Sequence, residues 1–283
     1  MMRMENATAD TWLEGDPYEL YVGRWSRQLA PRFLAWLNIP PSRRWLDVGC
    51  GTGALTSAIE ASCSPTSVTG VEPSEGFLAK ARQQLSHAVS LHAAPANRIP
   101  LESDSVDATV SGLVLNFVPD APEALGEMVR VTVEGGTIAA YVWDYAEKME
   151  MMRVFWDAAT ELDPDVASLD EGLRFPLCQP AALSRLFAGA GLREVETCAI
   201  EVPTPFADFD AYWRPLGRAG PRSHISGEPK RDRPRPTPRA GACPSLGEAG
   251  RPGDSGCACV VRTRHRLITD DRCGHLEGIC VAR

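Results

Sequence analysis

Asp47 and the three glycines that follow it are the residues whose types and spacing best suit ligand chemistry. Asp47 lies near the end of a short apolar run, residues 44–48, and Gly49, Gly51 and Gly53 come next. Such a run is typical of a buried parallel strand, and a helical pattern follows the glycines. A strand, a glycine loop and a helix in this order bring a nucleotide-like ligand to the carboxyl end of a central strand.

The loop also indicates what kind of ligand it would take. Side chains at Gly49 or Gly51 would fill the space that the ligand needs, and glycine adopts positive φ readily. The Asp47 carboxylate can accept from an ammonium group or stabilise a nearby positive charge. The spacing is G-x-G-x-G, with Cys50 inside it, whereas dinucleotide-binding folds use G-x-G-x-x-G. An NAD-dependent enzyme is therefore a less favoured alternative.

Glu72 is the second acidic candidate. It follows the β-branched run 67–71 and is followed by Pro73. It comes about 20 residues after the glycine loop, where a Rossmann-type fold places an acid that accepts from ribose hydroxyls. The alternative is a charge at the amino end of a helix that begins at Ser74, a good capping residue.

Residues 18–216 resemble the Rossmann-like, class I S-adenosylmethionine-dependent methyltransferases of the type 11/25 kind. The motif W-L-D-V-G-C-G-T-G at residues 45–53 and the acid at Glu72 carry the resemblance. It implies S-adenosyl-L-methionine as the cofactor, and methyl transfer to a small-molecule acceptor as the function. It also implies an α/β fold, a doubly wound and mostly parallel sheet in the order 3-2-1-4-5-7-6.

The resemblance further implies which residues bind the cofactor. Tyr21 and Arg24 would form a lid over it. The full predicted set is Tyr21, Arg24, Asp47, Gly49, Cys50, Gly51, Gly53, Glu72, Pro73, Ala96, Asn97 and Leu113.

No general base can be identified from the sequence, so the catalytic residues stay unassigned. Tyr21, Asp144 and Tyr145 are candidates by location alone. The methyl donor is already activated by its positive charge, so positioning for in-line attack could supply most of the catalysis.

Two positions depart from the pattern of the family. Pro95 stands where relatives have an aspartate that accepts from the adenine amino group, although the backbone around Ala96 and Asn97 could serve instead. The segment 116–119, Asn-Phe-Val-Pro, fails to match the Asn-Pro-Pro-Tyr loop of amino-group methyltransferases. Transfer to a nucleobase or to a glutamine amide is therefore not assigned.

The carboxyl-terminal part is a different kind of sequence. Residues 217–283 carry 13 Lys and Arg against 7 Asp and Glu, whereas the preceding 216 residues carry 16 against 30. They also contain no Phe, Trp or Tyr, so they bury little surface against their ordering entropy. We expect a mobile segment 1–17, a cofactor-binding domain 18–216 and a low-order tail 217–283.

The tail bears on both the fold and the activity. Only residues 257–269 have strand character, which leaves the seventh strand doubtful or missing. One hypothesis is that the tail is a shifted reading frame. With Pro95, the tail keeps open the alternative that the chain is a non-catalytic or defunct cofactor-binding protein of this fold.

Composition limits the other function classes. No signal peptide or membrane-spanning run is recognisable, which predicts a cytoplasmic protein without a membrane partner. The acidic body argues against a nucleic-acid partner. Nine cysteines, unevenly placed, predict no disulfide framework, and the Cys and His spacing in the tail matches no standard zinc finger, so no metal is expected. The sequence sets no oligomeric state.

Overall fold

The structure is a computed structural model that describes residues 23–218 and 256–264. The predicted mobile segment 1–17, the predicted lid residue Tyr21 and most of the tail 217–283 lie outside these ranges. In the part of the chain that is described, no helix is long and apolar enough to cross a membrane.

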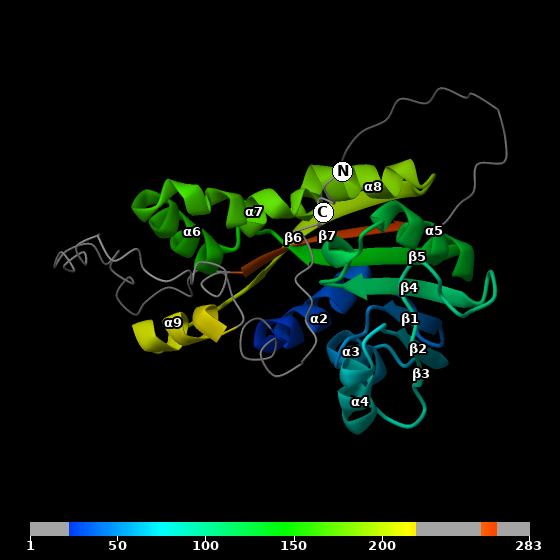
Figure 1. The fold of residues 1–283 in the computed structure, drawn as a ribbon. Helices are drawn as coiled ribbons and strands as arrows, with labels where there is room; N and C mark the ends of the chain where they lie inside the picture. The colour runs from blue at the N-terminus through cyan, green and yellow to red at the C-terminus, as the bar shows by residue number, and fades with distance from the viewer. Residues whose placement is uncertain (1–22, 219–255, 265–283) are drawn as a thin grey trace, which may run out of the picture.

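Seven strands form one sheet in the order β3-β2-β1-β4-β5-β7-β6, as predicted (Figure 1). The strands are β1 (Arg44–Val48), β2 (Ser67–Val71), β3 (Ser90–His92), β4 (Val106–Gly112), β5 (Thr132–Trp143), β6 (Arg193–Val202) and β7 (Gly256–Arg264). The first five strands are parallel to one another. β7 runs antiparallel to both β5 and β6.

β7 corrects the expectation that left the seventh strand doubtful or missing. Val260 lies opposite Tyr141 of β5 on one side and opposite Cys198 of β6 on the other. Without β7, both neighbours would present unpaired backbone at an edge. The strand lies largely within residues 257–269, the stretch with strand character, whose β-branched residues suit an internal position. The expectation was wrong because it was based on the composition of the surrounding residues.

Helices cover both faces of the sheet. Figure 1 shows α2, α3 and α4 on one side and α5 and α8 on the other. The helices are α2 (Arg24–Leu37), α3 (Ala54–Ser62), α4 (Glu75–Gln84), α5 (Ala121–Val131), α6 (Glu150–Leu162), α7 (Glu171–Arg174), α8 (Pro180–Gly189) and α9 (Phe209–Arg218), with 3-10 turns η2 (Leu115–Phe117), η3 (Pro164–Leu169) and η4 (Pro176–Cys178).

Two contacts fix the central strands relative to each other. Arg44 at the start of β1 binds Asp107 of β4 through its backbone N–H and two guanidinium nitrogens, at 2.8–3.0 Å. At the other end, the Ser111 hydroxyl donates to the Val48 carbonyl at 2.9 Å. The carboxyl ends of β1 and β4, where the functional candidates lie, are therefore held in one register.

The hydrophobic core lies against the middle of the sheet. Trp45 of β1 and Trp143 of β5 are buried. Phe33 of α2 meets Tyr141 of β5 edge to face, with ring centroids 4.7 Å apart. Aromatic packing of this kind stabilises beyond the area that it buries, so it holds α2 over the strand ends that carry the loops.

Candidate functional site

The glycine loop after β1 bends tightly around the end of β2. Gly49 and Cys50 both donate their backbone N–H to the Val71 carbonyl, at 2.8 and 3.0 Å. Gly49 has φ +75°, and a Cβ there would lie 2.5 Å from the Val114 side chain. Gly51 has φ +55°, yet a Cβ there would meet no described heavy atom within 4 Å. The loop therefore leaves open space directly above Gly51.

Gly53 has a different role from the other two glycines. Its φ is +94°, and an added Cβ would contact the Leu85 side chain at 3.0 Å. It caps α3 and does not line the cavity described below. Its need for glycine comes from the turn and from Leu85, so its place in the predicted cofactor set is not supported by its position.

Asp47 is buried at the end of β1, with 1% of its surface exposed. The Thr56 hydroxyl of α3 donates to its Oδ2 at 2.6 Å. Its Oδ1 is buried and has no hydrogen-bond partner among the described residues. Burial raises the pKa of Asp47 to about 7; the Thr56 bonds lower it and the Glu72 charge raises it. A positively charged ligand would satisfy the free oxygen and favour the ionised form.

Glu72, which follows β2, faces the same loop. Its Oε2 accepts from the Gly51 N–H at 3.2 Å and its Oε1 accepts from the Ser74 N–H at 2.9 Å. Burial raises the pKa of Glu72, although both hydrogen bonds act to lower it. The Ser74 hydroxyl caps α4 by accepting from Phe77 N–H. The two bonds of Glu72 therefore suit both a role at the glycine loop and a charge at the amino end of α4.

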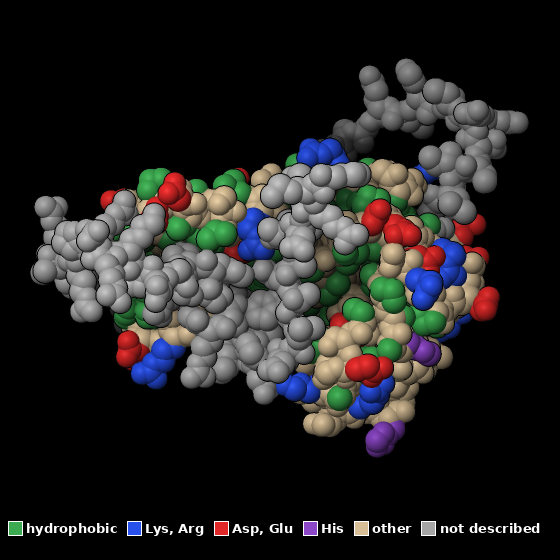
Figure 2. Space-filling view, in the orientation of Figure 1, with side chains coloured by type: hydrophobic (Ala, Val, Ile, Leu, Met, Phe, Trp, Pro, Cys, Tyr) green, Lys and Arg blue, Asp and Glu red, His purple; other side chains and the backbone are tan. Residues whose placement is uncertain are grey.

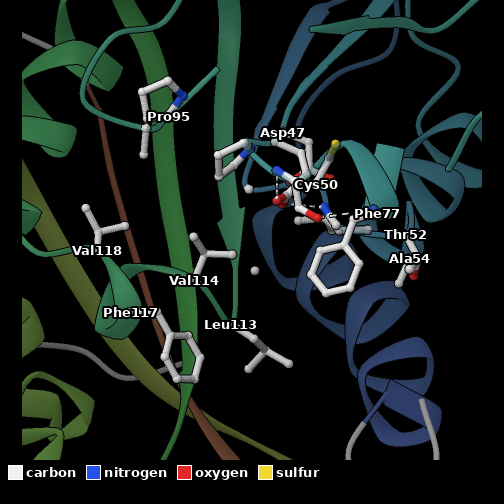
Figure 3. A pocket seen from close by; sticks show the side chains of 18 of the residues that line it. Asp47, Cys50, Thr52, Ala54, Phe77, Pro95, Leu113, Val114, Phe117 and Val118 are labelled. Carbon is white, nitrogen blue, oxygen red and sulfur yellow. Dashed lines mark hydrogen bonds between the residues drawn. The ribbon is translucent and has the colours of Figure 1, made fainter. Parts of the chain in front are cut away.

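These residues line one cavity of about 700 Å³ at the carboxyl ends of β1, β2, β3 and β4 (Figure 3). A cavity of this volume suits a drug-sized ligand. Nine of the twelve predicted cofactor residues line it, and they are Asp47, Gly49, Cys50, Gly51, Glu72, Pro73, Ala96, Asn97 and Leu113.

The predicted lid and acid–base candidates do not join this group. Tyr21 lies outside the described residues, and Arg24 is described only as the first residue of α2. Asp144 is buried and its Oδ1 accepts from the Glu147 N–H at 3.0 Å. Tyr145 is buried against Phe175, with ring centroids 5.8 Å apart. Neither Asp144 nor Tyr145 lines the cavity.

The structure adds lining residues that sequence reasoning missed. Phe77 of α4 is only half-buried and lines the cavity. Val114, Phe117 and Val118 after β4 line it as well. A signal for Phe77 existed, because it follows Glu72 by little more than one helical turn; no local pattern marks the residues after β4.

Pro95 also lies in the wall of the cavity. The position therefore offers neither a carboxylate nor a backbone N–H. Two residues further on, Asn97 donates its Nδ2 to Glu123 Oε2 at 2.8 Å. The Glu123 carboxylate therefore lines the same part of the cavity, although Pro95 itself supplies none.

Among the described residues, no group of three or more His, Cys, Asp or Glu side chains is arranged to hold a metal ion. The structure does not describe the Cys and His side chains of the tail, whose spacing matches no standard zinc finger.

Comparisons with known proteins agree with this geometry. A family model described as a methyltransferase domain matches residues 46–140. The demethylmenaquinone methyltransferase of Staphylococcus aureus is 34% identical over 110 residues, which are 38% of this chain and 46% of that protein. The matched part is thus less than half the length of these curated relatives.

Solved structures match a longer part of the chain. A phosphoethanolamine N-methyltransferase of Haemonchus contortus, in complex with phosphomonomethylethanolamine and S-adenosylhomocysteine, has a TM-score of 0.56 at 12% identity, covering 88% of this chain and 57% of that one. The [4+2]-cyclase SpnF has a TM-score of 0.51 at 17% identity, covering 85% and 81%. At these identities the likeness shows the fold alone.

Proposed function

Because residues 46–140 form a class I S-adenosylmethionine-dependent methyltransferase domain, we propose that the chain transfers a methyl group from S-adenosyl-L-methionine to a small-molecule acceptor. The cavity at the strand ends is where this family's cofactor would bind. S-adenosyl-L-methionine supplies a methyl group on a positively charged sulfur, which a nucleophilic atom of the acceptor takes.

The residues present fit this cofactor. The observation that carries the proposal is the hollow above Gly51, in the cavity that Asp47 and Glu72 also line; Oδ1 of Asp47 has no described partner, and Glu72 accepts from the Gly51 N–H. In the proposal, Glu72 accepts from the ribose hydroxyls and Asp47 faces the positively charged end of the ligand. Both roles require an acceptor-only group, which an ionised carboxylate is.

The remaining predicted residues would shape the walls. Pro73, Ala96, Asn97 and Leu113 line the cavity on its β2, β3 and β4 sides. Cys50 lines it as a neutral thiol, because burial raises the pKa of the Cys50 thiol far above its usual value. Tyr21 and Arg24 stay candidates for a cover over the ligand.

The chain's own part in the reaction would be to bind, orient and exclude water. Holding the acceptor in line with the methyl group converts a two-molecule reaction into one within the complex. Asp144 and Tyr145, the two candidate general bases that the structure describes, do not line the cavity. Acceptors that attack through a neutral nitrogen or carbon fit such a site.

Calorimetry with three ligands tests the proposal. The full chain should bind S-adenosylmethionine and its demethylated product S-adenosylhomocysteine, and should not bind NAD. Glu75→Gln on the exposed side of α4 serves as a control that leaves binding unchanged, since Glu75 pairs only with the exposed Arg82. Binding of NAD, or no binding of either sulfur ligand, would refute it.

A second candidate function is cofactor binding without turnover. The neutral Pro95 wall favours it, because that wall lacks the carboxylate found in relatives. The same fold also carries a different activity in the cyclase SpnF. Product formation across a panel of acceptors separates the two, and demethylmenaquinone, named by the Staphylococcus aureus relatives, is one acceptor to include. A cytoplasmic location without nucleic-acid or membrane partners remains part of the proposal.

A further inference from the structure

The cavity has two unlike walls. The ends of β1 and β2 supply the glycine loop and the buried carboxylates Asp47 and Glu72. The ends of β4 and β5 supply apolar side chains instead, namely Leu113, Val114, Phe117, Val118 and the ring of Tyr141. Figure 3 shows Phe117 and Val118 on the side opposite Cys50 and Phe77, with Val114 between the two groups, where it lies against Gly49. If the cofactor occupies the first wall, the second is left for the acceptor.

The apolar wall is held in shape by contacts behind it. The Phe117 ring meets Phe175 edge to face, with centroids 5.2 Å apart. The backbone N–H of Phe117 donates to the Val114 carbonyl at 2.8 Å, and that of Leu113 donates to the Tyr141 carbonyl at 2.8 Å. A preformed apolar surface binds an apolar ligand without the cost of ordering its own side chains.

The charges around the cavity have one sign. The acidic side chains that line it are Asp47, Glu72, Asp120 and Glu123, and no Lys, Arg or His is found among its described lining residues. A carboxylate or phosphate on the acceptor would lose its hydration without gaining a described counterion. It would also enter a field of its own sign.

The carboxylates on the acceptor's side are already engaged. Asp120 Oδ1 caps α5 by accepting from the Glu123 N–H at 2.8 Å. Glu123 Oε2 accepts from Asn97 Nδ2 at 2.8 Å. Asp120 is also exposed at the rim and can satisfy its charge with water. Each of these two carboxylates therefore has one oxygen bound by an uncharged donor of the protein, and neither belongs to the apolar wall.

We propose that the acceptor is an uncharged molecule that presents an apolar ring or chain to the wall of Val114, Phe117 and Val118. This rests on the proposed function, because the cofactor must fill the opposite wall. It excludes acceptors that carry a carboxylate, a phosphate or an ammonium group on the part that meets this wall, because each charge would lose its hydration against apolar side chains.

Three matched probes test the acceptor class by calorimetry on the full chain. They are 4-butylphenol, its analogue ending in a carboxylate and its analogue ending in an amine, each added with S-adenosylhomocysteine at saturation. The neutral probe should bind, and the two charged probes about tenfold or more weakly, since each must desolvate a charge. S-adenosylhomocysteine is titrated alone first.

Two variants sharpen the test by placing a cation in the apolar wall. Val118→Arg should raise affinity for the carboxylate probe about tenfold or more and weaken the neutral one, as a buried opposite charge compensates desolvation. If Val118→Arg fails to fold, Pro119→Arg at the exposed rim replaces it. It should also raise the affinity for the carboxylate probe and lower the affinity for the neutral probe. Val154→Arg on the exposed face of α6, outside the cavity, is the matched control and should change neither affinity.

The outcomes separate the two proposals. Loss of S-adenosylhomocysteine binding by the wild-type chain would overturn the proposed function, and the acceptor class with it. With S-adenosylhomocysteine bound, tighter binding of either charged probe, or binding of none, would overturn the acceptor class alone. Equal responses of Val118→Arg, Pro119→Arg and Val154→Arg would overturn it as well.

Discussion

The Thr56 hydroxyl donates to Asp47 Oδ2 at 2.6 Å, and both side chains are buried. The bond joins the end of β1 to the first turn of α3, across the glycine loop. It satisfies one carboxylate oxygen and leaves Oδ1 unpaired among the described residues. A buried, half-satisfied carboxylate is costly in an empty site, which is why this pair should respond to both pH and ligand.

Replacing Asp47 by Asn should change how stability depends on pH. Burial raises the pKa of Asp47 to about 7 in the folded chain, above its unfolded value of 3.8. Between pH 3.8 and about pH 7 the folded chain keeps the Asp47 proton, whereas the unfolded chain has lost it. The free energy of unfolding therefore falls as the pH rises through this range and levels off above about pH 7. Relative to wild type, Asp47→Asn should gain up to about 4 kcal/mol between pH 4 and pH 8.

Urea unfolding of both proteins across this range measures the difference. Groups that do not interact with Asp47 titrate equally in wild type and variant, so they cancel; Glu72, whose charge raises the pKa of Asp47, is the exception. A difference in the free energy of unfolding that stays constant with pH would contradict the prediction. Binding of a positively charged ligand should also release a proton near pH 6, which calorimetry in buffers of different ionisation enthalpy detects.

Replacing Thr56 by Val should destabilise the protein most at high pH. The variant keeps the shape of the side chain but removes the donor to an ionised carboxylate, which costs about 1.5–3 kcal/mol. At pH 5 Asp47 is protonated and needs the donor less, so the loss should shrink. Thr56→Ser retains the hydroxyl and is the control. Equal losses at pH 5 and pH 8 would show that packing, not the hydrogen bond, matters.

Replacing Glu72 by Gln should weaken cofactor binding without unfolding the chain. The amide can still accept one of the N–H bonds from Gly51 or Ser74. It offers only one acceptor oxygen to a ribose, however, and no charge. The loss should be about tenfold to a hundredfold in affinity for S-adenosylhomocysteine, against no change for Glu75→Gln. Wild-type affinity in Glu72→Gln would remove Glu72 from the site.

Gly51→Ala should fold and fail to bind. Its φ is +55° and its Cβ would project into open space, so the expected loss of stability is only about 1 kcal/mol, from the left-handed backbone. The methyl group would occupy the hollow that the ligand needs. Gly135→Ala is a matched control, because Gly135 has φ +77° and equal space but lies outside the cavity. Intact binding by Gly51→Ala would place the ligand elsewhere.

Val260→Pro should destabilise the whole sheet. Val260 pairs with both β5 and β6, so proline removes a ladder hydrogen bond from an internal strand and costs about 3 kcal/mol or more. Val260→Thr keeps the strand and is the control. Thermal unfolding measures the effect. Equal melting temperatures of Val260→Pro and wild type would mean that β7 adds nothing to the stability of the fold.

The hypothesis of a shifted reading frame has a separate test, which is peptide mapping of residues 217–283.

The sequence alone determined the local parts of this protein. The glycine loop, Asp47 and Glu72 follow from short patterns, because a strand, a turn and a helix cap depend on residues close together in the chain. The strand order came only from the family resemblance that these patterns carry. The distinct role of Gly53 needed the structure, since Leu85 approaches it from another element. So did Phe77, whose helical position suited the core as well as the cavity.

Tertiary structure decided what depends on distant segments. Whether residues 256–264 form a strand is settled by two neighbours that lie far earlier in the chain, and composition around the strand gave the opposite indication. Only the folded structure shows that the apolar side chains after β4 line the same cavity as the loop after β1. Pairing and cavity shape are non-local, and no pattern within a short window records them.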